Sequence, residues 1–144
     1  MALEHLKEGH HDKKALVVLS DGADNASKHS FREILAAAQR SQATIYSIGI
    51  YEPNSQDRDP RSLKELSHAT GGEAVFPQSM DEVEALCRHF ARTISTQYTL
   101  GYSPSNPAKD GSYRALRVMA STPNFGKLTV RTREGYFAPK GATP

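Results

Sequence analysis

The stretch of sequence that decides the fold is Lys14-Ala-Leu-Val-Val-Leu-Ser-Asp-Gly-Ala-Asp-Asn25. Its first part, Ala15–Leu19, is a continuous apolar run, and turn-forming residues follow it directly. A short apolar run with β-branched residues is typical of a parallel-sheet strand that is buried on both faces. The acidic turn Asp21–Asn25 should then lie at the carboxyl end of that strand, where open parallel sheets bind their ligands.

Helices and strands alternate after this first strand. The expected elements are a helix over 31–41 capped by Ser30 and Glu33, a strand over 43–51, a helix from Asp59-Pro60 to Gly71-Gly72, a strand over 73–76, and a helix over 83–94 capped by Ser79 and Glu82. Strands that alternate with helices imply right-handed crossovers onto a parallel sheet. Cys87, the single cysteine, falls on the apolar stripe of the last helix, so we expect it to pack in the core.

The pattern changes after Thr96. Tyr98, Leu100 and Tyr102 alternate as they would on a strand, and a second strand is expected over 113–120. Over 127–133 apolar or threonine side chains alternate with basic ones, which predicts a sheet with one buried and one solvated face. We therefore expect three regions: an α/β part over 1–96, a β-meander over 97–139 that packs on it, and a tail over 140–144.

These segments resemble the von Willebrand factor A (VWA) domain family. Lys14–Asn25 is similar to the fourth strand of that fold and its acidic turn, and Ala43–Ile50 resembles the next strand. Leu63–Gly72, followed by Phe76, resembles the helix and strand beyond it. The segment Gln97–Tyr136 resembles the C-terminal extension of a bacterial VWA-related group. The resemblance implies a three-layer, Rossmann-like α/β fold with a parallel sheet and flanking helices, followed by an antiparallel β-meander.

The resemblance also implies a divalent-cation site, which the family assembles from three loops. Asp21 matches the aspartate of one loop, but the family's Asp-x-Ser-x-Ser sequence is absent from these 144 residues. The chain therefore resembles the C-terminal part of a VWA domain. We expect at most a weak, partial metal site at Asp21, supported by Ser20, Asp24 and Asn25. No cofactor is expected in the isolated chain, although Mg²⁺ becomes possible if further residues or another chain complete the site.

The same resemblance raises a question about strand pairing. In the family the strand that matches Ala15–Leu19 lies in the middle of the sheet, beside the first strand. Without that neighbour one hydrogen-bonding edge is open, and an open apolar edge is a template for pairing. The edge residues are Ala15, Leu16, Val17, Val18 and Leu19. We expect them to pair with a second copy in a two-fold homodimer, and a meander strand that covers them is the alternative.

Three other kinds of chemistry have weaker support. His10 and His11 could bind a transition metal, but adjacent positions do not share a helix face. Ser20 with His29 or His68 could form a hydrolytic triad, but the Gly-x-Ser-x-Gly elbow is absent. Base stacking is the third possibility, although tyrosines on strands more often pack half-buried. The tyrosines concerned are Tyr98, Tyr102, Tyr113 and Tyr136.

Composition narrows the class of protein. The length of 144 residues favours one domain, and a net charge of +2 is too small to indicate nucleic-acid binding. No apolar stretch predicts membrane insertion, and the N-terminus lacks the apolar region of a signal peptide. We therefore expect a non-enzymatic module that binds a protein partner. The alternative is a structural or assembly fragment without metal function that dimerises through the strand over 15–19. The family resemblance suggests a bacterial protein that is exported.

Overall fold

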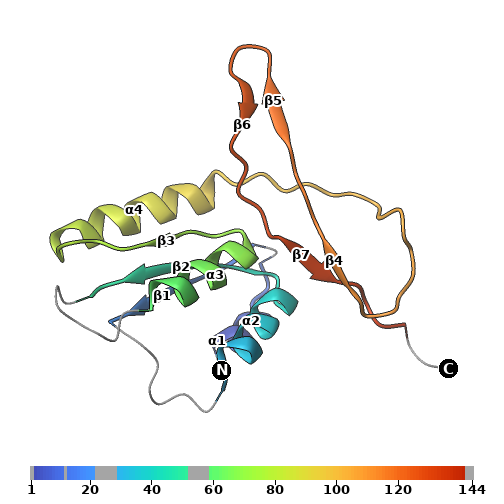
Figure 1. Ribbon diagram of the computed structural model, residues 1–144, viewed down its shortest axis with the longest axis horizontal. Coiled ribbons are helices and arrows are strands. Elements are labelled where there is room, and N and C mark those ends of the chain that lie inside the picture. Colours follow the sequence, from blue (N-terminus) through green and yellow to red (C-terminus); the bar gives the residue numbers. More distant parts are fainter. Residues whose placement is uncertain (1, 12, 22–28, 52–58, 142–144) are drawn as a thin grey trace.

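The chain folds into an α/β body from which an antiparallel ribbon projects, as the computed structural model in Figure 1 shows. The structure describes residues 2–11, 13–21, 29–51 and 59–141. The elements of the body are α1 (Ala2–Lys7), β1 (Lys14–Ser20), α2 (Phe31–Arg40), β2 (Ala43–Gly49), α3 (Pro60–Thr70), β3 (Ala74–Val75) and α4 (Asp81–Ser95). The ribbon holds β4 (Tyr113–Ala115), β5 (Ala120–Thr122), β6 (Gly126–Leu128) and β7 (Gly135–Phe137).

The body is built on a parallel sheet with the strand order β1-β2-β3. β1 pairs with β2 along its whole length, from Lys14 opposite Ala43 to Ser20 opposite Gly49. β2 is the central strand, and its side chains are almost completely buried. The parallel α/β sheet predicted from the alternation of strands and helices is therefore confirmed.

Helices cover both faces of this sheet, so the body has three layers, with the sheet in the middle (Figure 1). On one face Ile45 packs with Ala38 of α2 and Leu66 of α3. On the other face Tyr46 and Ile48 pack with Phe90 of α4, and the ring centroids of Tyr46 and Phe90 lie 4.9 Å apart. The core thus has two halves, which meet through the side chains of β2 that alternate from face to face.

β1 is only half covered, which corrects one expectation. Leu16 and Val18 pack against the cluster beneath α2 and α3. Val17 and Leu19 point to the opposite face and are 42% and 58% exposed. The strand itself is as predicted, but its burial on both faces is wrong. The physical reason is that β1 forms one side of the sheet, and Phe90 of α4 packs over β2 rather than over it.

The helix ends mostly follow the capping signals. Ser30 and Glu33 form the predicted capping box, with the Ser30 amide donating to the Glu33 carboxylate at 2.8 Å. Gly71 ends α3 in the left-handed conformation, at φ 82°. The second expected box is wrong, because α4 begins at Asp81 behind a cap residue whose side chain makes no capping hydrogen bond. The expectation for Cys87 is also wrong, since it lies beside the stripe through Phe90 and is exposed.

The ribbon contains the expected antiparallel strands, but in a different arrangement. β4 pairs with β7 and β5 pairs with β6, so the segment forms one long, interrupted hairpin. The expected strand at Tyr98, Leu100 and Tyr102 is wrong, since these residues belong to no strand and are 94%, 71% and 58% exposed. The strand expected over 127–133 stops at Leu128. The following residues of the ribbon lie outside any strand because they pack against the end of α3, where a Cβ on Gly71 would lie 2.6 Å from the Arg133 amide nitrogen.

The base of the ribbon contacts the body through polar and aromatic groups. The Arg133 guanidinium donates to the Ser41 carbonyl at 2.8 Å, and its partial burial lowers the pKa of Arg133. The Arg40 guanidinium lies 4.8 Å from the centre of the Phe137 ring. Gln97 donates to the Tyr46 hydroxyl at 2.7 Å. The first two contacts fix the base of the ribbon against the end of α2. The Glu134 amide donates to the Ala69 carbonyl of α3 at 3.4 Å, and the preceding stretch over 129–132 forms one wall of a cleft.

Candidate functional site

The acidic turn predicted as a metal site begins where the sequence placed it. Ser20 is the last residue of β1, and its carbonyl accepts a hydrogen bond from the Ile50 amide at 2.8 Å. Asp21 follows directly and is exposed. Both residues therefore lie at the carboxyl end of the sheet, which is the end at which parallel sheets present their ligand-binding groups.

The described donors are too few to enclose a divalent ion. Asp24 and Asn25 lie outside the described residues. Within the residues that the structure describes, no group of three or more His, Cys, Asp or Glu side chains could hold a metal. Magnesium needs near-octahedral oxygen coordination, and Ser20 with Asp21 supplies only a small part of it. A metal at this turn would therefore need further donors.

An aromatic pair lies at the same end of the neighbouring strands. The rings of Tyr51 and Phe76 stack with centroids 5.8 Å apart, and the Lys64 ammonium lies 5.3 Å from the Phe76 ring centre. Gly49 leaves room for this pair, because a Cβ there would come within 2.6 Å of the Phe76 ring. This end of the sheet therefore combines the exposed Asp21 with a stacked aromatic pair.

The structure does not bring the other sequence candidates together. His10 and His11 are exposed beyond α1. His68 binds Glu134 at 2.9 Å near the end of α3, at the opposite end of the sheet from Ser20. The described tyrosines mostly pack on other rings: Tyr102 contacts Tyr136, and Tyr113 contacts Phe137. These residues therefore assemble neither a Ser20–His68 pair nor a base-stacking row.

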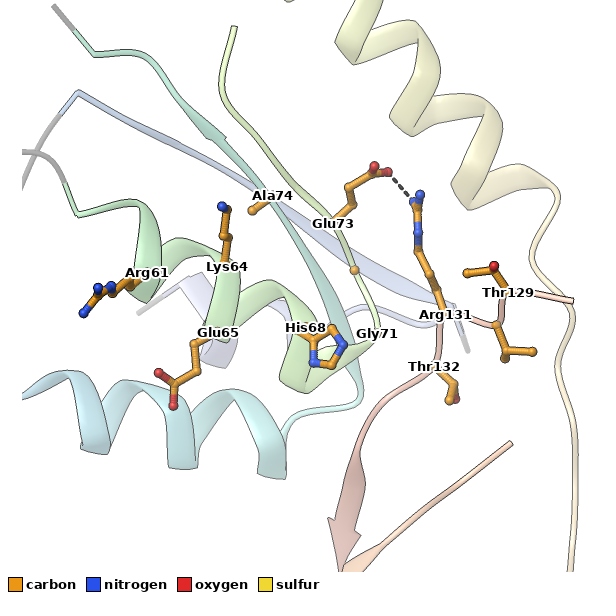
Figure 2. A pocket seen from close by; sticks show the side chains of 12 residues that line it. Arg61, Lys64, Glu65, His68, Gly71, Glu73, Ala74, Thr129, Arg131 and Thr132 are labelled. Atoms are coloured by element: carbon orange, nitrogen blue, oxygen red, sulfur yellow. Dashed lines mark hydrogen bonds and ion pairs between the residues drawn. The ribbon is translucent and has the colours of Figure 1, made fainter. Parts of the chain in front are cut away.

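A cleft that the sequence did not reveal lies beside β3, at the other edge of the sheet (Figure 2). Its volume is about 730 Å³. One wall is α3, the back is the stretch from Gly71 to Ala74, and the opposite wall is the ribbon stretch from Thr129 to Thr132. Charged side chains from α3 and from the ribbon line the cleft, and they are Arg61, Lys64, Glu65, His68 and Arg131.

Glu73 links three elements across this cleft. Its carboxylate accepts a hydrogen bond from His89 of α4 at 2.9 Å and pairs with Arg131 of the ribbon; Figure 2 shows the second contact. Burial alone would raise the pKa of Glu73, but these partners outweigh it and hold its pKa below the ordinary value. The ion pair therefore joins the edge of the sheet to the ribbon.

The sequence carried only a weak signal for this cleft. Arg131 was expected on the solvated face of a strand, and the glycines at 71 and 72 were expected only to stop a helix. In the structure Gly72 also allows close packing, since a Cβ there would lie 1.8 Å from the Ile45 carbonyl oxygen. Two adjacent glycines after a helix could have indicated that other backbone segments approach closely there.

Comparison with known proteins finds similar proteins, among them the following two. An uncharacterized protein from Borreliella burgdorferi is 32% identical over 90 residues, which cover 50% of this chain and 26% of that protein. A crystal structure of an uncharacterized membrane-spanning protein from Vibrio fischeri matches with a TM-score of 0.51 at 21% identity. That match covers 58% of this chain and 48% of the other. The chain thus spans about a quarter and about half of these two proteins, and the second match supports the fold alone.

In the described part of the chain, no helix is long and apolar enough to cross a membrane.

The family comparison agrees with the fold. The model of the von Willebrand factor type A domain matches residues 1–89. This match takes in the whole parallel sheet and most of α4. VWA domains are in general protein-interaction modules rather than enzymes. From the sheet, its covering helices and this match together, we conclude that the chain belongs to the von Willebrand factor type A domain family.

Proposed function

We propose that this chain is a non-enzymatic protein-binding module of the VWA type. The observation that carries the proposal is the side of the sheet formed by β1, where Val17 and Leu19 are exposed and Asp21 follows at the carboxyl end. Large apolar side chains that remain exposed beside one another on a sheet mark interaction surfaces. Family membership supports the same class of function.

The acidic turn contributes an incomplete metal-ion-dependent adhesion site in this proposal. Asp21 supplies the carboxylate, and Ser20, Asp24 and Asn25 supply supporting oxygens. In the isolated chain we expect this partial site to bind Mg²⁺ at most weakly, at high metal concentration, and tightly only where other residues or another chain complete its coordination.

A thermal-shift experiment tests this role of Asp21. The melting temperature is measured with and without Mg²⁺ or Mn²⁺ for the wild type, for Asp21→Ala and for Glu8→Ala, which removes an exposed carboxylate far from the turn. A metal-dependent rise in the wild type and in Glu8→Ala that is lost in Asp21→Ala supports the adhesion site. If no variant responds, the site plays no part and the next candidate stands.

The second candidate is an assembly role in which two copies pair through β1. Ser20 directs its carbonyl to β2, so the alternating backbone groups of Val17 and Leu19 point away from β2. Among the described residues, β2 is the one strand that pairs with β1. A two-fold dimer would pair this edge with its own copy and place the exposed side chains of the two copies beside one another on one face. Light scattering tests it: a dimer is expected, and a monomer at all concentrations contradicts it.

A bacterial, exported setting completes the proposal. It follows from the family resemblance, and the Vibrio fischeri neighbour is described as membrane-spanning. Fractionation of cells that carry the native gene tests the location: recovery outside the cytoplasm supports it, and recovery in the cytoplasm alone contradicts it.

A further inference from the structure

We propose that the cleft beside β3 binds an extended, acidic peptide segment, which adds as a strand to the free edge of β3. The inference rests on the proposed protein-binding function and gives it a second surface, distant from Asp21 and β1. Four features of the cleft support it: its backbone groups, its opposite wall, its charge and its size.

The edge of β3 offers backbone groups for such pairing. The Glu73 carbonyl accepts a hydrogen bond from the Ser47 amide at 2.9 Å, so the backbone amide and carbonyl of Glu73 face β2. Backbone groups alternate in direction along a strand, and Ala74 therefore turns its amide and carbonyl away from β2. Among the described residues, no strand pairs with this outer edge. Peptides bind such edges by main-chain hydrogen bonds.

The ribbon stretch over 129–132 faces the unpaired edge of β3 on the side opposite α3. At the closed end of the cleft the chain at Thr132 presses on Gly71, where a Cβ would lie 2.7 Å from the Thr132 carbonyl carbon. From there the stretch over 129–131 continues outside any strand. Figure 2 shows it separated from Ala74, with the Glu73–Arg131 pair between them. The edge of β3 is thus flanked by α3 and by the stretch over 129–132, which favours one narrow extended segment over a broad protein surface.

The charge of the cleft favours an acidic segment. Glu73 is paired with Arg131, and His68 is paired with Glu134. Lys64 and Arg61 lie exposed on the α3 wall and form no ion pair with another described residue. Glu65 is the one carboxylate among the described residues of that wall. Figure 2 shows Lys64 directed toward the level of Ala74 and Glu65 directed away from it. A carboxylate on a segment paired with Ala74 would therefore meet Lys64.

The size of the cleft sets the length of the segment. β3 has two residues, Ala74 and Val75, and of these Ala74 presents its backbone groups outward. A volume of about 730 Å³ holds a few residues of extended chain rather than a folded domain. Because few main-chain hydrogen bonds can form, we expect reversible binding that depends strongly on the contact with Lys64.

The probe is a short, fluorescein-labelled peptide that alternates valine with threonine and carries one central aspartate. Its binding to the full chain is measured by fluorescence polarisation. Two matched peptides are compared with it: one has asparagine in place of aspartate, and one carries N-methyl groups that remove the pairing amides. We expect both to bind at least tenfold more weakly than the parent peptide.

Protein variants locate the site. Lys64→Glu should weaken binding at least tenfold, whereas Lys127→Glu, the same charge change on exposed β6, should leave it unchanged. Ala74→Pro removes the outward amide and should abolish binding, because proline is tolerated on edge strands but cannot donate. Ala74→Ser keeps the amide and should bind like the wild type.

The outcomes separate this inference from the proposed function. Equal binding of the parent and N-methylated peptides, or equal effects of Lys64→Glu and Lys127→Glu, would overturn it. If Ala74→Pro does not fold by circular dichroism, the N-methylated peptide and Lys64→Glu decide the question. Asp21→Ala should bind the peptide normally, so a failed metal or dimer test leaves this result intact.

Discussion

The two outer strands of the sheet differ in what they present to a partner. β1 has seven residues, and the side chains of Val17 and Leu19 are exposed on the face that α4 leaves open. β3 has two residues and is enclosed by α3 and by the ribbon. Among the described residues, one edge is therefore long, apolar and unpaired, and the other is short, charged and flanked by other elements.

This difference assigns different kinds of partner to the two edges. A long apolar edge gains most from complete pairing with another strand and from burial of its side chains. A short charged edge forms few hydrogen bonds, so it suits a reversible contact that is selected by charge. The same parallel sheet can thus hold a stable interface on one side and an exchangeable one on the other. The following predictions test this division, beginning with the largest effect.

Gly72→Ala should disrupt the pairing of β3 with β2. The added Cβ would lie 1.8 Å from the Ile45 carbonyl oxygen, so β3 would have to move away from β2. We expect the free energy of unfolding to fall by about 3 kcal/mol, as for severe overpacking. Urea denaturation measures it. Gly101→Ala is the control, because a Cβ there meets no atom within 4 Å. A loss below about 1 kcal/mol for Gly72→Ala would show that the β2–β3 junction is not tightly packed.

Leu19→Lys should dissociate the proposed homodimer without unfolding the chain. Leu19 is 58% exposed, so the change costs little packing within one copy, whereas a lysine on the edge opposes strand pairing. We expect the dimer dissociation constant to rise at least tenfold in analytical ultracentrifugation, which corresponds to about 1.4 kcal/mol. Leu100→Lys, on a residue 71% exposed outside the sheet, should leave the dimer intact. Equal behaviour of both variants would exclude β1 from the interface.

Glu73→Gln should change how stability depends on pH. The pKa of Glu73 is lowered in the folded chain, so its carboxylate stabilises the fold above the ordinary value of 4.5. This contribution is lost as the pH falls through the lowered pKa. The wild type should therefore lose stability more steeply than Glu73→Gln below about pH 4.5, by up to about 1 kcal/mol, because the pair is partly exposed to solvent. Urea denaturation between pH 3 and 7 measures it. Parallel curves for the two proteins would contradict the role of Glu73, and Glu84→Gln on α4 is the control.

Much of the body could be predicted from the sequence, because local signals and burial agree there. The apolar content of β2, the capping box at Ser30 and Glu33, and the left-handed Gly71 each specify local structure that packing then reinforces. These elements need no information from outside their own neighbourhood. The parallel arrangement of the strands followed from the alternation of helices and strands.

The ribbon and the cleft could not be predicted in the same way. Alternation over 127–133 resembles a strand, but the strand ends at Leu128 because Thr132 packs on Gly71. That contact joins residues about sixty positions apart, which no local pattern records. The exposure of Val17 depends on what covers β1, and this too is absent from the pattern of the strand itself.

Amide hydrogen exchange at Val17 and Leu19 tests the central claim most directly. Their amides point away from β2, so within one copy they have no strand partner among the described residues. If β1 is an interface, their exchange should slow strongly as the protein concentration rises and the dimer forms, while the Ala74 amide stays fast until the acidic peptide is added. Fast exchange of Val17 and Leu19 at every concentration, in a chain that sediments as a monomer, would contradict the account.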